Sequence, residues 1–527
     1  MGIYVNPDNS VLLADMRQEI YIDKSMIIPE LNKVFGTSTS SRVCVSRPRR
    51  FGKTMVGNLI SAYYTRGTDS HEVFDRLELS KHENWAERLN KCNVIKVDLG
   101  AFFSRYRSEG HVIKHMTADV VGEMVTEFPD LNIEPDWKLS KAILHVFQKT
   151  GIQFVIIIDE YDVMVREKVP ESDFAEYLDM LNDLFKGDDS VKAIGLAYIT
   201  GIIPIVRDRV QSKLNNFKEY TMLEPLRFAP YIGFTLEEVK TLCDRFGVDY
   251  DECLRWYDGY HIAPKVSICN SNSVCEAIMN KKFKDYWSKT GAYAAISDYI
   301  SMDFDGIKED ISTMIGGGSV EVNVSSFANR LSDLNTKDKV FTYLIHLGYL
   351  AYDDETGTCR IPNGEIRNEW KNAVEDMRDM TPVFKMIRNS ERLLKATIAR
   401  DQEAVAAALD EAHKHVTSAI TYNDEGALQS AVGLAYFSAT SQYTIVREMP
   451  AGEGFADIAF VPYVKGAPGI IMELKMDKSP KAALDQIKDR GYASVFKNYS
   501  GPVYLIGVSY GKRTEKHKCL IEVVEKD

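Results

Sequence analysis

The chain has 527 residues, of which 45% are hydrophobic and 27% are charged, as in ordinary folded proteins built from roughly three or four domains. A formal net charge of −12 argues against a protein that coats nucleic acid nonspecifically, but it is compatible with a nuclease, whose metal site is itself acidic. The sequence has no membrane-length apolar stretch and no signal peptide, and its eight cysteines form no Cys-x-x-Cys pair. It therefore predicts a cytoplasmic protein without membrane contact.

The first informative segment is Arg47–Thr54, which lies between a short apolar strand, Val43–Val45, and a helical pattern, Met55–Tyr64. This strand–loop–helix context is typical of a P-loop, in which backbone N–H groups and the N-terminus of the helix surround the phosphates of a nucleotide. The position at which the usual motif has its first glycine is Arg47.

The segment ends with the tripeptide Gly52-Lys53-Thr54, which has the chemistry that nucleotide binding requires. Gly52 belongs to the phosphate-binding turn, Lys53 would reach the β- and γ-phosphates, and the Thr54 hydroxyl would ligate Mg²⁺. Because Gly-Lys-Thr alone is a weak signal, the prediction depends on a second part of the site.

That second part is Phe154–Glu160, an apolar run that ends in two carboxylates. The run is typical of a strand buried on both faces of a parallel sheet. Asp159 would hold Mg²⁺ and Glu160 would polarise the attacking water; the alternative is a buried strand followed by a polar turn. Ala193–Thr200 is another buried strand, and Thr200 would sense the γ-phosphate or simply form a turn or N-cap.

Other segments complete an α/β, doubly wound parallel sheet over residues 1–225, because strands alternate with helices. The further elements are the helix Met26–Val34, the strand Asn93–Asp98, and the helices His111–Phe128 and Phe174–Phe185.

The middle of the chain is predicted to be helical and then winged-helix-like. Residues 226–315 form a helical extension with helices at Leu236–Phe246 and Asp251–Trp256. Residues 316–370 contain a strand, a helix and a hairpin: Val320–Val324, Lys339–Leu347, and Gly348–Tyr352 with Thr358–Ile361. Without a basic recognition helix, this region is favoured as a connection between domains over a DNA reader. Residues 371–420 form a helical linker to a C-terminal domain at residues 421–527.

The C-terminal domain contains a second constellation, formed by Asp457, Glu473 and Lys475. Residues two apart on a strand point to the same face, so Glu473 and Lys475 project together, and pairing of adjacent strands can bring Asp457 beside Glu473. Two carboxylates that hold Mg²⁺ or Mn²⁺, with one lysine, are what metal-dependent phosphodiester cleavage requires. The alternative is a solvated strand end with an ordinary ion pair.

The helices that flank this constellation offer further side chains. Glu425, on a helix starting near Asn423, is a candidate third metal ligand. The helix Ser479–Tyr492 offers Gln486 to the site. Four basic residues on or beside that helix could meet phosphates: Lys478, Lys481, Lys488 and Arg490.

Taken together, these residues resemble a bacterial family that joins an AAA-ATPase-like N-terminal domain to a C-terminal PD-(D/E)XK nuclease-superfamily domain. The matching motifs are Tyr21–Lys24, Arg47–Thr54, Ile158–Asp162, Ile199–Gly201, Leu214–Asn216, Trp256–Tyr260, Leu347–Leu350, Ile361–Asn363, Gly454–Asp457 and Glu473–Lys475. The string Arg-Pro-Arg-Arg-Phe-Gly-Lys is specific to that family, in which the missing first glycine is expected. Two positions depart from the superfamily pattern: Ala456 stands where its name has Pro, and Phe455 where a small or basic residue is expected.

The resemblance implies a P-loop NTPase fold of the AAA-like type and a restriction-endonuclease-like α/β fold. It groups four residues as an ATP site: Lys53, Thr54, Asp159 and Glu160. Arg49 and Arg50 would touch phosphate or a neighbouring subunit, or simply lie on the surface. Arg207 or Arg209 would supply an arginine finger or sensor. Proteins of this kind often assemble, so a homo-oligomer is expected as one possibility.

The leading hypothesis is an ATP-binding and ATP-hydrolysing protein coupled to a metal-dependent nuclease-like domain that acts on DNA or RNA. An alternative is a scaffold ATPase whose nuclease-like domain binds nucleic acid or protein without cleavage. A third is a slowly hydrolysing switch in a defence or toxin system. The presence of Asp457, Glu473 and Lys475 together favours cutting, and the intact Asp159 and Glu160 favour hydrolysis.

Overall fold

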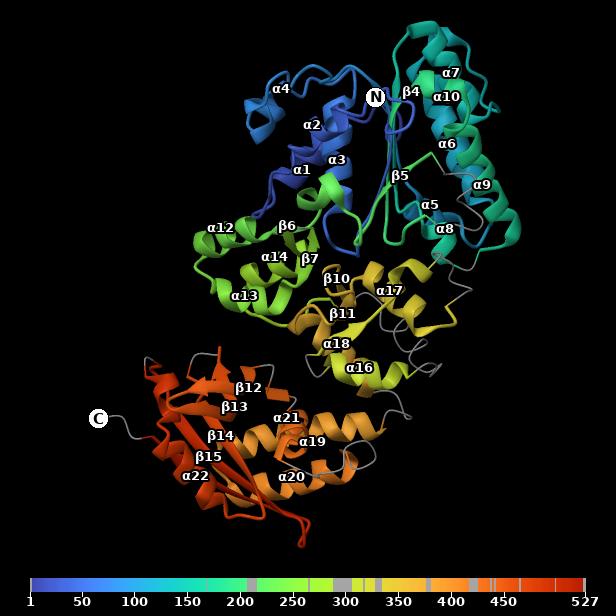
Figure 1. The fold of residues 1–527 in the computed structure, drawn as a ribbon. Helices are drawn as coiled ribbons and strands as arrows, with labels where there is room; N and C mark the ends of the chain where they lie inside the picture. The colour runs from blue at the N-terminus through green and yellow to red at the C-terminus, as the bar shows by residue number, and fades with distance from the viewer. Residues whose placement is uncertain are drawn as a thin grey trace. The chain divides into compact units, whose positions relative to one another are not determined.

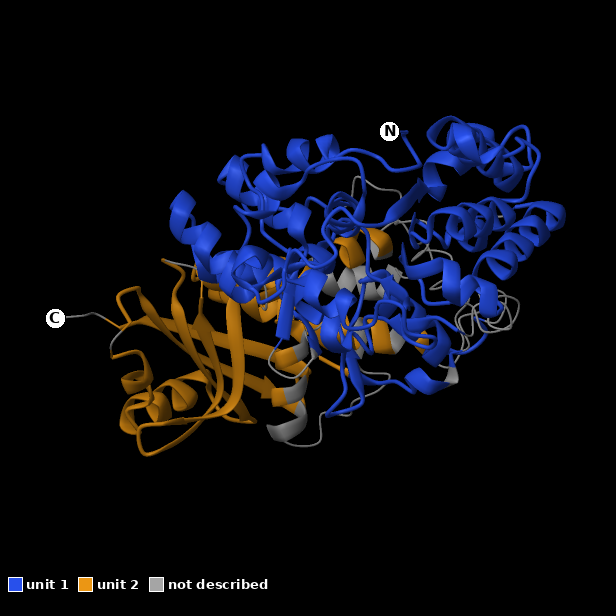
Figure 2. Ribbon diagram, turned by 90° about the horizontal axis from the view of Figure 1, so that it is seen from above, with its two compact units in different colours: residues 1–291, 320–368 blue, residues 292–319, 369–527 orange. Residues whose placement is uncertain are grey.

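The computed structural model describes residues 2–167, 169–205, 216–263, 266–287, 306–315, 318–327, 334–375, 381–416, 425–436, 438–439, 442–463, 466–497 and 499–524. The chain divides into two compact units, coloured separately in Figure 2. Unit 1 comprises residues 1–291 and 320–368, and unit 2 comprises residues 292–319 and 369–527. Among the described helices, none is long and apolar enough to span a membrane.

Unit 1 is built on a five-stranded sheet in which every described pair is parallel, in the order β2-β3-β4-β1-β5. The strands are β1 (Arg42–Ser46), β2 (Asn93–Asp98), β3 (Phe154–Asp159), β4 (Ile194–Gly201) and β5 (Lys218–Tyr220). β1, β3 and β4 are buried along their whole length, as their continuous apolar sequences predict. The predicted doubly wound α/β class is confirmed.

Helices cover both faces of this sheet, with α1, α2 and α3 on one side and α6, α7 and α9 on the other (Figure 1). Their bounds are α1 Ser10–Met16, α2 Ile27–Asn32, α3 Lys53–Tyr64, α4 His71–Phe74, α5 Leu99–Tyr106, α6 Val112–Glu127, α7 Leu139–Thr150, α8 Val163–Arg166, α9 Glu171–Phe185 and α10 Asp188–Ala193. The helices predicted at residues 26–34, 111–128 and 174–185 are therefore confirmed with small shifts at their ends.

A small sheet and three helices continue unit 1 after the parallel sheet. They are β6 Phe234–Thr235, β7 Tyr260–Ala263, β8 Val266–Cys269, α12 Leu236–Phe246, α13 Tyr250–Tyr257 and α14 Ser271–Asn280. α12 starts with a capping box, in which Thr235 and Glu238 satisfy each other's backbone N–H groups, and its C-cap is Gly247 at a φ of +65°. These caps explain why the helix predicted from the sequence has the observed bounds.

The region predicted as winged-helix-like has its helix and hairpin. α17 (Lys337–Leu347) is followed by the antiparallel pair β10 (Ala351–Asp353) and β11 (Thr358–Arg360). The strand predicted at 320–324 is shorter, because β9 pairs with β11 only through Val320 and Glu321. The Asn323 side chain then accepts the N–H of Ser325 and starts a 3-10 turn at residues 324–326.

Unit 2 contains a mixed five-stranded sheet in the order β12-β13-β14-β15-β16. The strands are β12 Tyr443–Ala451, β13 Gly454–Pro462, β14 Gly469–Met476, β15 Val503–Gly511 and β16 Lys516–Val523. Only β14 and β15 are parallel among these pairs, and α22 (Pro480–Asp489) lies in the connection between them. α22 packs closely on β15: a Cβ added to Gly507 would lie 2.1 Å from the carbonyl oxygen of Pro480.

Two hydrophobic cores cover the two faces of this sheet. One contains residues of α22 with those of β14 and β15, such as Leu484, Ile471 and Leu505. The other joins the sheet to three helices, α19 (Thr381–Ile398), α20 (Gln402–Val416) and α21 (Glu425–Ala435). The remaining described α-helices are α16 Ile307–Ile315 and α18 Gly364–Glu375. The C-terminal domain predicted from the sequence thus has a mixed α/β sheet.

Candidate functional site

The loop between β1 and α3 has the shape of a phosphate-binding turn. Gly52 precedes the helix with a φ of +88°, a conformation that glycine adopts without strain. Lys53 begins α3, and its Nζ donates to the carbonyl oxygens of Arg47 at 3.0 Å and Pro48 at 2.8 Å. Burial lowers the pKa of Lys53 to about 8. Lys53 therefore stabilises the loop through hydrogen bonds to the loop's own backbone, and these hydrogen bonds would have to break before it contacted a phosphate.

Arg47, which replaces the usual first glycine, holds two strands together and does not line the pocket. Its side chain is fully buried, and its Nη1 donates to the carbonyl oxygens of Ser46 at 2.8 Å, Tyr220 at 3.2 Å and Thr221 at 2.8 Å. Because Ser46 ends β1 and Tyr220 ends β5, the guanidinium joins these two strand ends. Burial lowers its pKa to about 10.

The carboxyl ends of the parallel strands bring the predicted polar residues together. Asp159 accepts a hydrogen bond from Thr54 Oγ1 at 2.5 Å through Oδ2, and another from Thr200 Oγ1 through Oδ1. Asp98, at the end of β2, lies level with Asp159 in the strand register. Three side chains predicted from separate motifs are thus in direct contact. Thr54 and Asp159 together offer the hydroxyl and carboxylate oxygens that Mg²⁺ prefers.

Glu160 follows β3 with a positive φ of 52°, and its carboxylate is held by a residue that the sequence did not single out. Arg166, on α8, donates to Glu160 Oε2 at 3.3 Å and through Nε to Asp162 Oδ2 at 3.0 Å. Burial raises the pKa of Glu160, and the positive charge of Arg166 opposes that rise. Asp162 also accepts the N–H groups of Ile202 and Ile203, both at 3.0 Å.

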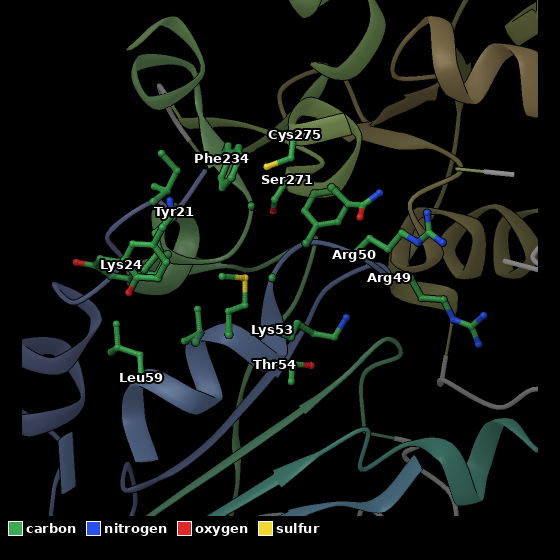
Figure 3. Close-up of a pocket in the computed structure, with 18 of the residues that line it drawn as sticks. Tyr21, Lys24, Arg49, Arg50, Lys53, Thr54, Leu59, Phe234, Ser271 and Cys275 are labelled. Carbon is green, nitrogen blue, oxygen red and sulfur yellow. The ribbon is translucent and has the colours of Figure 1, made fainter. Parts of the chain in front are cut away.

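Lys53, Thr54, Asp159 and Glu160 border a cavity of about 730 Å³, and the rest of its lining comes from other parts of unit 1. Tyr21, Phe234 and Cys275 form an apolar end, away from Lys53 and Thr54 (Figure 3). Lys24 lies at the same end, where its Nζ donates to Glu238 Oε2 at 2.6 Å and to the carbonyl oxygen of Pro230 at 2.8 Å. A cavity with Lys53, Arg49 and Arg50 toward one end and Tyr21, Phe234 and Cys275 toward the other has the polarity of a nucleotide.

Arg49 and Arg50 point away from the apolar end (Figure 3). Arg50 has a φ of +66° and donates from Nη1 to the carbonyl oxygen of Tyr286 at 2.9 Å. The N–H of Tyr286 in turn donates to Glu365 Oε1 at 2.8 Å, and the Ser273 hydroxyl donates to the same oxygen at 2.9 Å. Burial raises the pKa of Glu365 to about 7.

Arg50 therefore anchors the loop to the start of α18, which the sequence did not suggest. Arg49 lines the cavity. Arg207 and Arg209, the candidate fingers, lie outside the described residues.

The second site lies in unit 2, where β13 and β14 separate. Their recorded pairing ends at Ile458 opposite Met472. One residue further on, the Asp457 carboxylate replaces a backbone acceptor, because its Oδ2 accepts the N–H of Leu474 at 2.7 Å. Asp457 is thus held beside Glu473, as the predicted strand pairing requires.

Glu473 is the most constrained carboxylate of this site. It is 1% exposed, and its Oε1 accepts from Lys475 Nζ at 3.1 Å and from Gln486 Nε2. Its second oxygen, Oε2, is buried without a hydrogen-bond partner among the described residues. Burial raises the pKa of Glu473 to about 7, and the charge of Asp457 raises it further while Lys475 lowers it. A buried carboxylate oxygen without a partner is what a cation would satisfy.

The donor set fits a divalent metal ion, although it consists of two carboxylates and not three. Within the described residues, no three His, Cys, Asp or Glu side chains group closely enough to hold a metal ion. Glu425 begins α21, and its side chain lies outside the described part. Gln429, one turn later on that helix, donates to the Asp457 carbonyl oxygen at 2.5 Å. The start of α21 is therefore connected to the site through Gln429.

The basic residues predicted around α22 have different surroundings. Lys488 pairs with Glu522 at 2.5 Å, and Arg490 Nη1 donates to the Glu453 carbonyl oxygen at 2.9 Å. Lys481 is exposed, and Lys478 borders a separate hollow near the end of β14. Gln486 is the member of this set that contacts a carboxylate of the site.

Comparison with known proteins gives two domain matches and several weaker likenesses. Residues 14–211 match a family described as "Predicted AAA-ATPase", and residues 423–519 match the PD-(D/E)XK nuclease superfamily. A protein of Azotobacter chroococcum mcd 1, "Uncharacterized protein in vnfD 5'region", is 21% identical over 516 residues, which cover 93% of each chain.

Among solved structures, the Aeropyrum pernix ORC1 protein in complex with DNA is 13% identical with a TM-score of 0.29, over 71% of this chain and 98% of that one. The ORC2 protein of the same organism is 12% identical with a TM-score of 0.31, over 70% and 98%. The first match contains Lys53, Thr54, Asp159 and Glu160, and the second contains Asp457, Glu473 and Lys475. The chain thus joins an N-terminal predicted AAA-ATPase-like domain to a C-terminal domain of the PD-(D/E)XK nuclease superfamily.

Proposed function

We propose that this protein binds and hydrolyses ATP and that its C-terminal domain is a metal-dependent nuclease acting on DNA or RNA. The observation that carries the nuclease proposal is Glu473: a buried carboxylate with one unsatisfied oxygen, held by Lys475 and Gln486 beside Asp457. A buried oxygen without a hydrogen-bond partner destabilises the fold by about 1–3 kcal/mol, so a purely structural role for the Glu473–Lys475 ion pair does not explain it.

At the ATP site, each residue has a separate task. Lys53 leaves the carbonyls of Arg47 and Pro48 and donates to the β- and γ-phosphates. Thr54 and Asp159 would hold Mg²⁺, which supplies charge neutralisation for the phosphates when bound. Glu160 orients the attacking water, and Thr200, whose hydroxyl donates to Asp159, would sense the γ-phosphate.

At the nuclease site, Asp457 and Glu473 would hold Mg²⁺ or Mn²⁺, which supplies Lewis-acid activation of the scissile phosphate when bound. Metal binding requires the ionised form of Glu473, and burial raises the pKa of that carboxylate, so protons and the metal ion compete and activity at low metal concentration should fall at acidic pH. Lys475 donates to Glu473 at 3.1 Å, and its ammonium would orient the attacking water and stabilise the developing negative charge. Gln486 fixes the orientation of Glu473.

The test is cleavage of labelled single- and double-stranded DNA and RNA with Mg²⁺ or Mn²⁺, with and without ATP. Lys475→Ala should abolish cutting and leave ATP turnover unchanged, whereas Lys53→Ala should abolish ATP turnover. Lys497→Ala is the matched control, because Lys497 is an exposed lysine beyond the far end of β14, where Phe496 packs on Gly469.

Cutting that survives Lys475→Ala would contradict the assignment of the nuclease site. ATP turnover without cutting on any substrate would favour the scaffold alternative, in which the C-terminal domain binds without cleaving. A change of cutting rate with ATP that is lost in Lys53→Ala would show that the two sites are coupled.

A further inference from the structure

A basic hollow lies in unit 2 at the end of the sheet where β14 and β15 finish and β16 begins. It has a volume of about 680 Å³. Five basic side chains border it: Lys478, Lys512, Arg513, Lys516 and Lys518. The carboxylate of the lining, Asp477, accepts the backbone N–H of Lys512 at 2.9 Å. Figure 1 shows the β15–β16 hairpin in red at the C-terminal end of the chain.

Three of the five cations of this hollow have no carboxylate partner among the described residues. Lys478, Arg513 and Lys518 are exposed, and none of them has a carboxylate within salt-bridge distance among the described residues. Lys516 pairs with Asp410 at 3.0 Å, and both groups remain partly exposed. In a chain with a net charge of −12, such a concentration of cations marks a surface for an anionic partner.

The strand register connects this hollow to the nuclease site. Lys475 lies opposite Ser509 on β15, and Ser509 lies opposite Lys518 on β16. Residues directly opposite each other project from the same face of a sheet, so Lys475 and Lys518 share one face, two strands apart, roughly 10 Å between their backbones. This is the face that α22 covers next to Gly507, and the hollow begins beyond the N-terminus of that helix.

We propose that the basic hollow binds the backbone phosphates of the nucleic-acid strand that is cut at Asp457, Glu473 and Lys475. This inference rests on the proposed nuclease function and adds the element that holds the substrate. Lysine and arginine side chains on an exposed hairpin contact phosphates without reading base edges, so binding should be independent of sequence and sensitive to salt. The β15–β16 hairpin thus sets the direction in which the strand leaves the active site.

The experiment measures binding of a short fluorescent oligonucleotide, single-stranded or duplex, to the full chain carrying Lys475→Ala. Onto this background we place the triple variant Lys478→Gln, Arg513→Gln and Lys518→Gln. The matched control removes two lysines and one arginine elsewhere in unit 2: Lys395→Gln, Arg400→Gln and Lys497→Gln. All three control residues are exposed, and α19, which contains Lys395, belongs to the core on the opposite face of the sheet.

The hollow variant should weaken binding at least tenfold and lower the slope of log Kd against log salt by up to about 2–3, since each lost phosphate contact accounts for roughly 0.7–0.9. In the protein with Lys475 intact, it should raise KM for cleavage more than it lowers kcat. The control triple variant should change neither the Kd for the oligonucleotide nor the KM for cleavage by more than twofold.

If both triple variants weaken oligonucleotide binding equally, the loss comes from the change in net charge and the proposal is overturned. Cleavage by the unmodified protein would still support the nuclease function. Loss of oligonucleotide binding in the hollow variant, with no cleavage by the unmodified protein, would sustain the binding surface and refute the nuclease. The same variants are also tested for binding to a polyglutamate peptide. If the hollow variant loses more affinity for this peptide than for the oligonucleotide, the hollow binds an acidic protein segment and the proposal is overturned.

Discussion

Glu473 gives the sharpest prediction, because its burial makes ionisation costly in the folded protein. Its pKa of about 7 lies above the ordinary value of 4.5, so folding opposes loss of the proton. The cost is absent below pH 4.5, grows between pH 4.5 and 7, and is fully present above pH 7. At about 1.4 kcal/mol per pKa unit it reaches roughly 3 kcal/mol, and local stability therefore falls as the pH rises.

Glu473→Gln removes this cost while keeping an oxygen that can accept from Lys475 and Gln486. In a chelator, we expect the variant to be more stable at pH 8.5 by up to roughly 3 kcal/mol, and equal to the wild type near pH 4.5. Unfolding of a chain with two units is not two-state, so the measurement is amide hydrogen exchange of β14 peptides by mass spectrometry. The predicted gain in protection at pH 8.5 is up to roughly 300-fold.

The control is Glu522→Gln, which removes an exposed carboxylate on β16 and its pair with Lys488. A surface ion pair contributes little to stability, so this variant should lose slightly in protection and not gain. Equal protection of Glu473→Gln and wild type at pH 8.5, or a gain that does not depend on pH, would refute the reasoning. Addition of Mn²⁺ should stabilise the wild type and not the variant, because the ion neutralises the carboxylate that the variant lacks.

Three further predictions concern other described contacts. ATP affinity, measured with a fluorescent analogue, should be constant below pH 8 and fall up to tenfold per pH unit above it, because Lys53, with a pKa of about 8, loses its proton. Lys53→Arg should remove this pH dependence. A wild-type affinity that does not change with pH would contradict the assignment of Lys53 to phosphate binding. Arg166→Met should destabilise unit 1 by roughly 3–5 kcal/mol, because the buried Asp162 loses its cation; protection of β3 peptides that stays unchanged would argue against this. Gly507→Ala should displace α22 and lower the rate of cleavage at least tenfold. The control is Gly122→Ala, which has open space around the added Cβ and should leave cleavage unchanged. Normal cleavage by Gly507→Ala would show that α22 adjusts without cost.

The sequence was most informative where function depends on strand ends. Thr54, Asp159 and Thr200 come from three separate motifs, and their meeting follows from the parallel sheet, whose strands all end at one edge. Asp457 and Glu473 lie within their strands, and it is the pairing of adjacent antiparallel strands that brings them together. In both cases a local strand pattern was enough, because the sheet supplies the long-range geometry.

The sequence did not reveal contacts that depend on which distant segments pack together. Phe234 and Cys275 complete the cavity beside Lys53 and Thr54, although they lie beyond residue 225, where the predicted ATPase domain ended. Arg166 and Glu365 likewise have no motif, since their roles arise from packing of α8 and α18. Tyr21 belonged to a recognised motif without an assigned role, and the cavity supplies one. Periodicity cannot show such neighbours, because nothing in it specifies the packing partner.

The separation of β13 and β14 at Asp457 has a consequence for judging relatives of this protein. Asp457 completes the hydrogen bonding of the sheet by accepting the N–H of Leu474, so selection for a folded domain would retain it even after catalysis was lost. Lys475, by contrast, pairs with a carboxylate that can simply take up a proton. An inactive descendant would therefore keep its aspartate and lose its lysine, and the lysine is the better marker of a working nuclease.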